Sequence, residues 1–90
     1  MLYMIVETFR GGDPGPAGDR FRERGRMLPD GLVYHASWLE LDGTRCFQLM
    51  ETDDAALLDL WISRWSDLVD FETTPVATSS DFWAARRPTP

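Results

Sequence analysis

The chain has 90 residues, the length of one domain with a small core. Its net charge is −6 and it contains no Lys, so nucleic acid and anionic membrane surfaces are disfavoured as partners. A hydrophobic content of 43% excludes a wholly disordered chain, and a single cysteine excludes an internal disulfide framework, so we expect a cytoplasmic location.

The first predicted element is a strand from Leu2 to Phe9 with apolar side chains on both parities, which is typical of a central strand. This start is short and lacks a basic n-region, so we expect neither a signal peptide nor a membrane span. Glu7 interrupts the apolar run. A buried carboxylate is costly unless it is paired or protonated, so Glu7 is a functional candidate; the alternative places it in water at the sheet rim.

The next predicted elements are a loop from Arg10 to Gly18 and a helix from Ala17 to Met27. The glycines match no nucleotide-binding pattern, so we interpret the loop as a connection in which Asp13 caps the helix and Pro14 starts it. An anion site is one interpretation of the arginines, but a solvated helix face is favoured. The outward positions are Arg20, Arg22, Glu23, Arg24 and Arg26.

A β-hairpin is predicted where Asp42-Gly43 separates two strand-like runs, Tyr34 to Leu41 and Thr44 to Glu51. Asp-Gly favours a two-residue type I′ turn, which sets the register of the two strands. The resulting cross-strand pairs are Glu40 with Arg45, Trp38 with Phe47, Ala36 with Leu49 and Tyr34 with Glu51.

Both faces of this hairpin carry too much apolar surface to lie in water. We expect the helices to cover the face with Leu39, Cys46, Gln48 and Met50. The other face, with Tyr34, Trp38 and Phe47, is expected to be joined by Tyr3, Ile5 and Glu7 and covered by a second copy of the chain.

The second predicted helix begins at Thr52-Asp53-Asp54 and ends at Ser66-Asp67. Its apolar stripe is predicted to be core: Leu57, Leu58, Trp61, Ile62 and Trp65. A last strand, Leu68 to Thr78, has the proline and alternating acids of an edge strand. The tail, residues 79–90, has Ser80-Asp81 as a predicted cap and Phe82-Trp83 as a predicted anchor.

The order β-α-β-β-α-β predicts an α+β, ferredoxin-like domain over residues 1–78. Its four-stranded antiparallel sheet is expected to carry two helices on one face. Because the other face needs a cover, we predict a homodimer that closes as a dimeric α/β barrel.

Several stretches together resemble a small bacterial family catalogued as a domain of unknown function, of the 3303 type. They are 4–9, Ser37-Trp38, Asp42-Gly43, 46–54, Trp61, Trp65 and 67–76. More distantly, the chain is similar to dimeric α/β-barrel proteins, which include cofactor-independent monooxygenases, isomerases and haem-handling enzymes. Such a varied group implies no particular reaction and no particular cofactor.

The residues leave three hypotheses open. The first is a dimer that binds a small, partly apolar molecule between its sheets, with Tyr3, Glu7, Tyr34, Trp38, Phe47 and Glu51 as ligand-binding residues. The second is a cofactor-independent monooxygenase- or isomerase-like enzyme that uses Glu7 or His35 as its base. The third is an interaction module with a packed dimer core. We expect Cys46 to be a buried hydrophobe and expect no metal site, because zinc-ligand spacing is lacking.

Overall fold

The computed structural model describes residues 1–86. The predicted α+β class with a four-stranded antiparallel sheet is confirmed, and a third α-helix is present besides the two expected. The elements are β1 (Leu2–Phe9), a 3-10 turn η1 (Arg10–Gly12), α1 (Gly15–Arg24), β2 (Val33–Leu39), β3 (Arg45–Glu51), α2 (Ala55–Ser63), β4 (Val69–Val76) and α3 (Ser79–Ala85).

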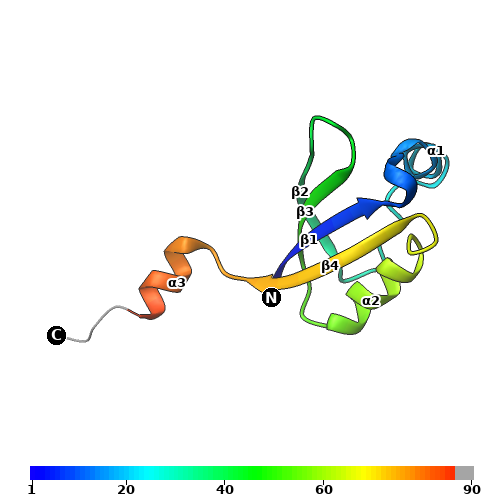
Figure 1. Cartoon of the computed structure of the whole chain (residues 1–90). Coiled ribbons are helices and arrows are strands. Elements are labelled where there is room, and N and C mark those ends of the chain that lie inside the picture. The colour runs from blue at the N-terminus through cyan, green and yellow to red at the C-terminus, as the bar shows by residue number, and fades with distance from the viewer. Residues whose placement is uncertain (87–90) are drawn as a thin grey trace.

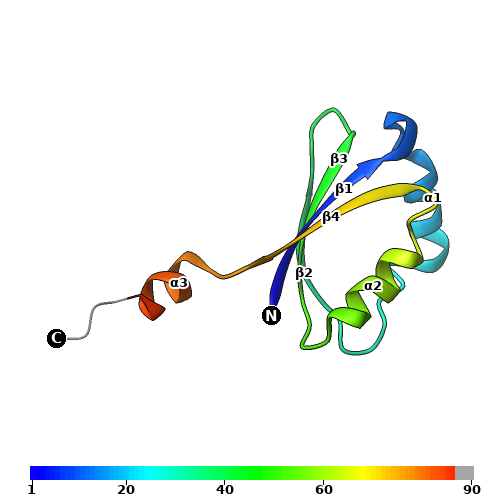
Figure 2. The ribbon, with the colours of Figure 1, turned by 60° about the horizontal axis from the view of Figure 1, so that its bottom comes forward.

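The strands lie in the order β2-β3-β1-β4, and each neighbouring pair is antiparallel. Strand β1 is central and β4 is an edge strand, as predicted. Helices α1 and α2 lie on the same side of the sheet (Figure 2). Buried side chains therefore alternate with more exposed ones along β1 and β3.

The face under the helices holds the core. Strand β3 contributes Cys46, Gln48 and Met50, which are all buried, so the predicted choice of covered face for β3 is confirmed. The remaining core residues are Ile5, Phe9, Ala17, Leu32, Leu58, Trp61, Trp65 and Val69.

The prediction that Tyr3, Ile5 and Glu7 lie on the open face is wrong. Strand β1 pairs with β3 so that Glu7 is opposite Cys46, which places it on the helix-covered side. Because side chains alternate strictly, this register sends Leu2, Met4 and Val6 to the open face instead. Sequence periodicity could not settle this point, because both parities of β1 are apolar.

The hairpin has the predicted pairing near its tip. Trp38 lies opposite Phe47, and Arg45 and Glu40 form an ion pair. The turn itself differs from the prediction, because the Gly43 N–H donates to the Glu40 carbonyl at 2.9 Å and Gly43, unlike Asp42, has a positive φ of 76°. A type I′ turn needs positive φ at both central residues.

A second difference lies at the other end of β2. The register shifts between Tyr34 and Ala36, so His35 is an extra residue and Tyr34 lies opposite Met50 rather than Glu51. Such a bulge turns the residue before it to the opposite face of the sheet. Tyr34 therefore lies on the helix side.

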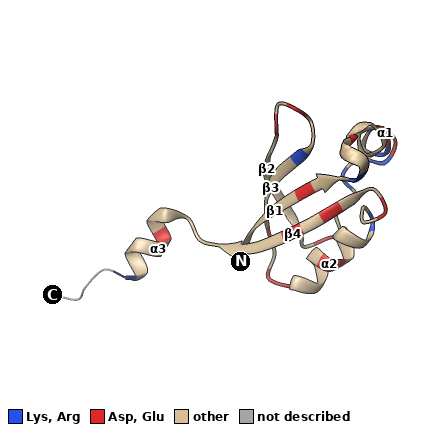
Figure 3. Ribbon diagram, in the orientation of Figure 1, with Lys and Arg blue, Asp and Glu red and all other residues tan. Residues whose placement is uncertain are grey.

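Helix ends follow local signals. Asp13 accepts a hydrogen bond from the Gly15 N–H at 2.9 Å, but α1 begins one residue later than predicted, with Pro14 at its N-cap position. Asp54 caps α2 by accepting from the Ala56 N–H at 2.9 Å. Helix α1 stops at Arg24, before the predicted end, because Gly25 adopts a positive φ of 67°. Basic positions gather around α1 (Figure 3).

Helix α3 stands apart from the sheet and the other helices (Figure 1). Thr78 rather than Ser80 is its cap, accepting from the Asp81 N–H at 3.0 Å. Phe82 and Trp83 pack edge to face with ring centroids 5.2 Å apart. The predicted tail also includes residues 87–90, which lie outside the described residues.

Candidate functional site

Glu7 lies at the middle of the central strand, on the face under the helices. Its side chain is 7% exposed, and its cross-strand neighbours are Cys46 and Phe71. Burial raises the pKa of the Glu7 carboxyl, while hydrogen bonding from Gln48 and Cys46 opposes the rise in part. Glu7 is therefore a carboxyl that takes up a proton more readily than an exposed glutamate.

Two polar neighbours on β3 accompany Glu7. Burial, together with the adjacent Glu7 carboxylate, raises the pKa of the Cys46 thiol to about 12, so Cys46 stays a neutral thiol. Gln48 is 5% exposed, and its Oε1 atom has no hydrogen-bond partner within residues 1–86. An unpartnered buried amide oxygen is costly, which makes this position a place where a donor would bind favourably.

The segment after α1 brings a cation to the same place. Its backbone is held by α2 and the turn that follows it: Trp61 and Trp65 both donate their indole N–H groups to the Arg26 carbonyl, at 2.9 and 3.1 Å. Arg64 donates to the Met27 carbonyl at 2.7 Å. Met27 has a positive φ of 58°, an uncommon conformation for a non-glycine residue that these hydrogen bonds help to hold.

The Arg26 side chain packs between aromatic rings. Its guanidinium carbon lies 3.7 Å from the Tyr34 ring centroid and 5.1 Å from that of Phe21. Its Nε atom is buried without a hydrogen-bond partner, and within residues 1–86 no carboxylate forms an ion pair with it. Arg26 contributes only the smallest of the effects on the Glu7 pKa.

These groups line a pocket of about 300 Å³ between α1 and the sheet. Phe21 and Leu39, which are 47% and 60% exposed, contribute to its lining and place part of it near solvent. The polar lining residues are Glu7, Arg26, Ser37, Cys46 and Gln48, and the apolar ones include Phe9, Ala17, Trp61, Trp65 and Val69. The arrangement is an apolar cavity with a few convergent polar groups, the usual character of a small-molecule site.

The structure separates the predicted ligand-binding residues. Glu7 lines the pocket, and Tyr34 lies behind it, stacked on Arg26 with its hydroxyl 2.7 Å from the Ser37 Oγ. Tyr3 is on the same face but packs against the core. Trp38 and Phe47 lie on the opposite face of the sheet, away from Glu7.

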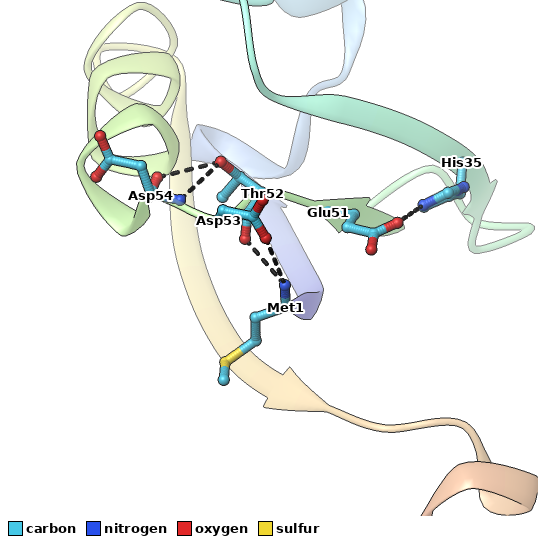
Figure 4. A network of polar contacts seen from close by, with 6 residues as sticks. All are labelled: Met1, His35, Glu51, Thr52, Asp53 and Asp54. Atoms are coloured by element: carbon cyan, nitrogen blue, oxygen red, sulfur yellow. Dashed lines mark hydrogen bonds and ion pairs between the residues drawn. The ribbon is translucent and has the colours of Figure 1, made fainter.

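Glu51 and His35 lie at one end of the sheet. The His35 Nε2 and Glu51 Oε1 atoms are 2.9 Å apart, and both side chains are exposed in part (Figure 4). Glu51 is opposite Leu2, whereas Glu7 is opposite Cys46, so the two carboxylates lie on different faces. The prediction that they share a face is wrong.

Arg26 is the site residue that sequence reasoning missed. The sequence pattern predicts it on the solvated face of the first helix, but the helix ends at Arg24 and Arg26 turns toward the sheet. Gly25 after a run of helix formers was the available signal, because a glycine there commonly ends a helix. Cys46 and Gln48 were assigned correctly to the helix side but not to a site.

The fold and site together define an α+β domain with a mainly apolar pocket, containing a few polar groups, between one helix and the sheet. The family model described as Domain of unknown function (DUF3303) matches residues 1–89, so the chain belongs to that family. Neither curated proteins nor solved structures yield a match.

In residues 1–86 no group of three or more His, Cys, Asp or Glu side chains is arranged to hold a metal ion. Within the same range, every helix is too short or too polar to traverse a bilayer.

Proposed function

We propose that this domain binds a small, partly apolar molecule in the pocket between α1 and the sheet. The main observation in support is a cavity of about 300 Å³ whose apolar lining surrounds the buried Glu7 carboxyl. The unpartnered Gln48 Oε1 and Arg26 Nε atoms support the proposal, because such atoms are usually satisfied by a ligand, water or another residue. This site replaces the cavity between two sheets that the sequence led us to expect.

A thermal-shift screen against a panel of small metabolites tests this proposal. A ligand present at about 100 times its Kd stabilises the folded state by roughly 2.7 kcal/mol, which is readily measured in a domain of this size. We expect at least one panel member to raise the Tm of the parent chain by an amount that Glu7→Gln changes. Glu72→Gln is the matched control, because Glu72 is exposed on β4, opposite Val6 on the open face.

A variant that fills the pocket provides a second test of the proposed site. Gly18 lines the pocket, and a Cβ built there meets no atom within 4 Å. Gly18→Leu is therefore expected to fold and to abolish every ligand shift. Ligand shifts that survive Gly18→Leu unchanged would contradict the proposed site.

The open face of the sheet supports a homodimer. Trp38 is 56% exposed, and Phe47, Leu49, Met4 and Val6 lie half-buried on the same face. A contiguous apolar surface of this kind commonly marks a protein interface, and an identical copy supplies a matching one. This interface would leave the pocket between α1 and the sheet uncovered.

Light scattering coupled to gel filtration tests the dimer. We expect the parent to elute with twice the mass of one chain and Trp38→Glu to elute as a monomer. Leu41→Glu is the control, because Leu41 is fully exposed at the hairpin tip, outside this face. A parent that is monomeric at millimolar concentration would refute the dimer.

The second candidate function is proton transfer at an acidic carbon, as in an isomerase. The observation that favours it is the raised pKa of Glu7 in an apolar cavity, which brings a carboxyl nearer to the working range of a general base. Proton exchange at the central carbon of acetylacetone in deuterated water, followed by NMR, measures this activity. Equal exchange rates in the parent and in Glu7→Gln would exclude it.

A further inference from the structure

Arg26 is a cation placed in an apolar cavity without a counter-ion. Of the chain's other arginines, Arg10, Arg20, Arg22 and Arg45 each form an ion pair with a carboxylate. Arg26 forms none in the described part of the chain, although its Nε atom is buried. Arg26 as a whole is half-buried, and a partly desolvated charge without a partner is unfavourable, so an anion bound at this position would be favoured.

The position of Arg26 is also held from two sides. Two indole N–H groups from α2 and the turn after it fix its carbonyl, and the rings of Tyr34 and Phe21 pack against its guanidinium. A side chain held in this way loses little conformational freedom when a ligand binds, which is the general requirement of a preorganised site. An arginine is also the side chain best suited to a carboxylate, which it can bind through two parallel hydrogen bonds.

The surroundings decide what the rest of the ligand is. The cavity of about 300 Å³ is lined mainly by apolar side chains, among them Phe9, Trp61 and Val69. Taking roughly 30 Å³ for a water molecule in the liquid, it has room for about ten waters or a ligand of similar size. A strongly hydrated ion such as phosphate would gain nothing from these walls, whereas a ring or an alkyl chain would.

We infer that the pocket takes the anion of a small apolar monocarboxylic acid, whose carboxylate binds Arg26. This inference rests on the proposed function and names the ligand class of the same site. The ligand carboxylate accepts from the Arg26 Nε–H, which gives that buried atom a partner.

Binding of such an anion is coupled to the ionisation of Glu7. The titratable and charged groups around Glu7 are the Cys46 thiol on β3 and Arg26 on the segment after α1, while α2 and β4 present apolar side chains there. Cys46 stays neutral because its pKa lies at about 12. An ionised Glu7 repels a carboxylate, so affinity is expected to fall as pH rises through the Glu7 titration.

The experiment compares ligands of one shape and different charge. The probes are benzoate, 3-phenylpropanoate, octanoate and indole-3-acetate, each with its primary amide, titrated into the ¹⁵N-labelled full chain at pH 6 and followed by NMR. Fragments of about nine to thirteen heavy atoms bind in the millimolar range, which this method measures. We expect at least one acid to bind at least tenfold more tightly than its amide.

Two variants test whether the preference for an acid over its amide depends on Arg26. Arg26→Gln is expected to weaken binding of the acid at least tenfold and to leave the amide within about twofold. Arg24→Gln removes the same charge from the exposed end of α1 and is expected to change neither. Should Arg26→Gln fail to fold, Glu7→Gln still tests the inference, because its affinity for the acid must depend less on pH than that of the parent chain.

The outcomes are distinct. Equal binding of acid and amide, equal effects of Arg24→Gln and Arg26→Gln, or no binding of any acid would each overturn the inference. If acids and amides bind equally and both lose their binding with Gly18→Leu, the pocket is a ligand site and the anion assignment alone is wrong. If no probe and no member of the metabolite panel binds, the proposed function fails with it.

Discussion

Gly18 provides the most direct test of whether α1 stands off the sheet. It is helical, half-buried and lines the pocket, and a Cβ built on it meets no atom within 4 Å. Glycine inside a helix costs about 0.5–1 kcal/mol relative to alanine. Because nothing opposes the new methyl group, Gly18→Ala is expected to raise the free energy of unfolding by that full amount.

Gly18→Leu extends the test into the cavity. A leucine side chain adds roughly 100 Å³, about a third of a pocket of about 300 Å³, and burying half of that side chain contributes a further ~1 kcal/mol. At about 4–8 °C per kcal/mol for a domain of this size, the expected rise in Tm is about 2–8 °C for alanine and about 6–16 °C for leucine.

Urea unfolding followed by tryptophan fluorescence and by circular dichroism measures both variants. The two probes should give the same midpoint if unfolding is two-state. A loss of stability with Gly18→Ala would show that the methyl group meets a packed surface. In that case α1 lies against the sheet, and the pocket on which both functional proposals rest does not exist.

Three further predictions concern the groups around the pocket. Because burial raises the Glu7 pKa above its ordinary value of 4.5, the folded state binds more protons than the unfolded state just above pH 4.5, and the parent loses stability as pH rises through that window. Glu7→Gln removes this loss, so its unfolding free energy is flatter from pH 4.5 to 8 and higher at neutral pH. Cys46, buried and with a pKa of about 12, should react with iodoacetamide at pH 8 at least about 100-fold more slowly in the folded chain than in urea. Trp61→Phe and Trp65→Phe each leave one indole on the Arg26 carbonyl, whereas the double variant leaves none, so its destabilisation should exceed the sum of the single ones by about 1 kcal/mol.

Each of these has a clear contrary result. A pH profile for Glu7→Gln as steep as that of the parent, with Glu72→Gln as the control, would place the titration on another group. Equal alkylation rates for Cys46 in buffer and in urea would mean that β3 is open to solvent. Strict additivity of the two tryptophan substitutions would show that the Arg26 carbonyl is satisfied in another way.

Local patterns predicted the elements well, because their causes lie within a few residues along the chain. The Thr52-Asp53-Asp54 stretch does mark the start of α2, although the cap is Asp54, its last residue, and no acid lies in the first turn. Pro75 lies on an edge strand as its missing N–H requires. The hairpin register near Trp38 was also predictable, since cross-strand pairing of charges and aromatics favours one alignment. The turn was not, because Asp42-Gly43 is compatible with more than one loop length.

The candidate site was predictable only at Glu7, whose charge in an apolar strand is visible without a structure. Its partners were not, because Arg26 reaches it through the end of α1 and two indole hydrogen bonds from residues more than 30 positions away. An arginine after a helix looks the same in sequence whether it faces water or a cavity.

The sequence by itself determined the type and order of the four strands and of the first two helices, since hydrophobic periodicity, caps and prolines act locally. Tertiary structure alone decided which parity of β1 lies under the helices, because both parities are apolar and only pairing with β3 distinguishes them. That register places Glu7 beneath α1 beside Cys46 and Gln48, and it moves the candidate pocket from the open face of the sheet to the covered one.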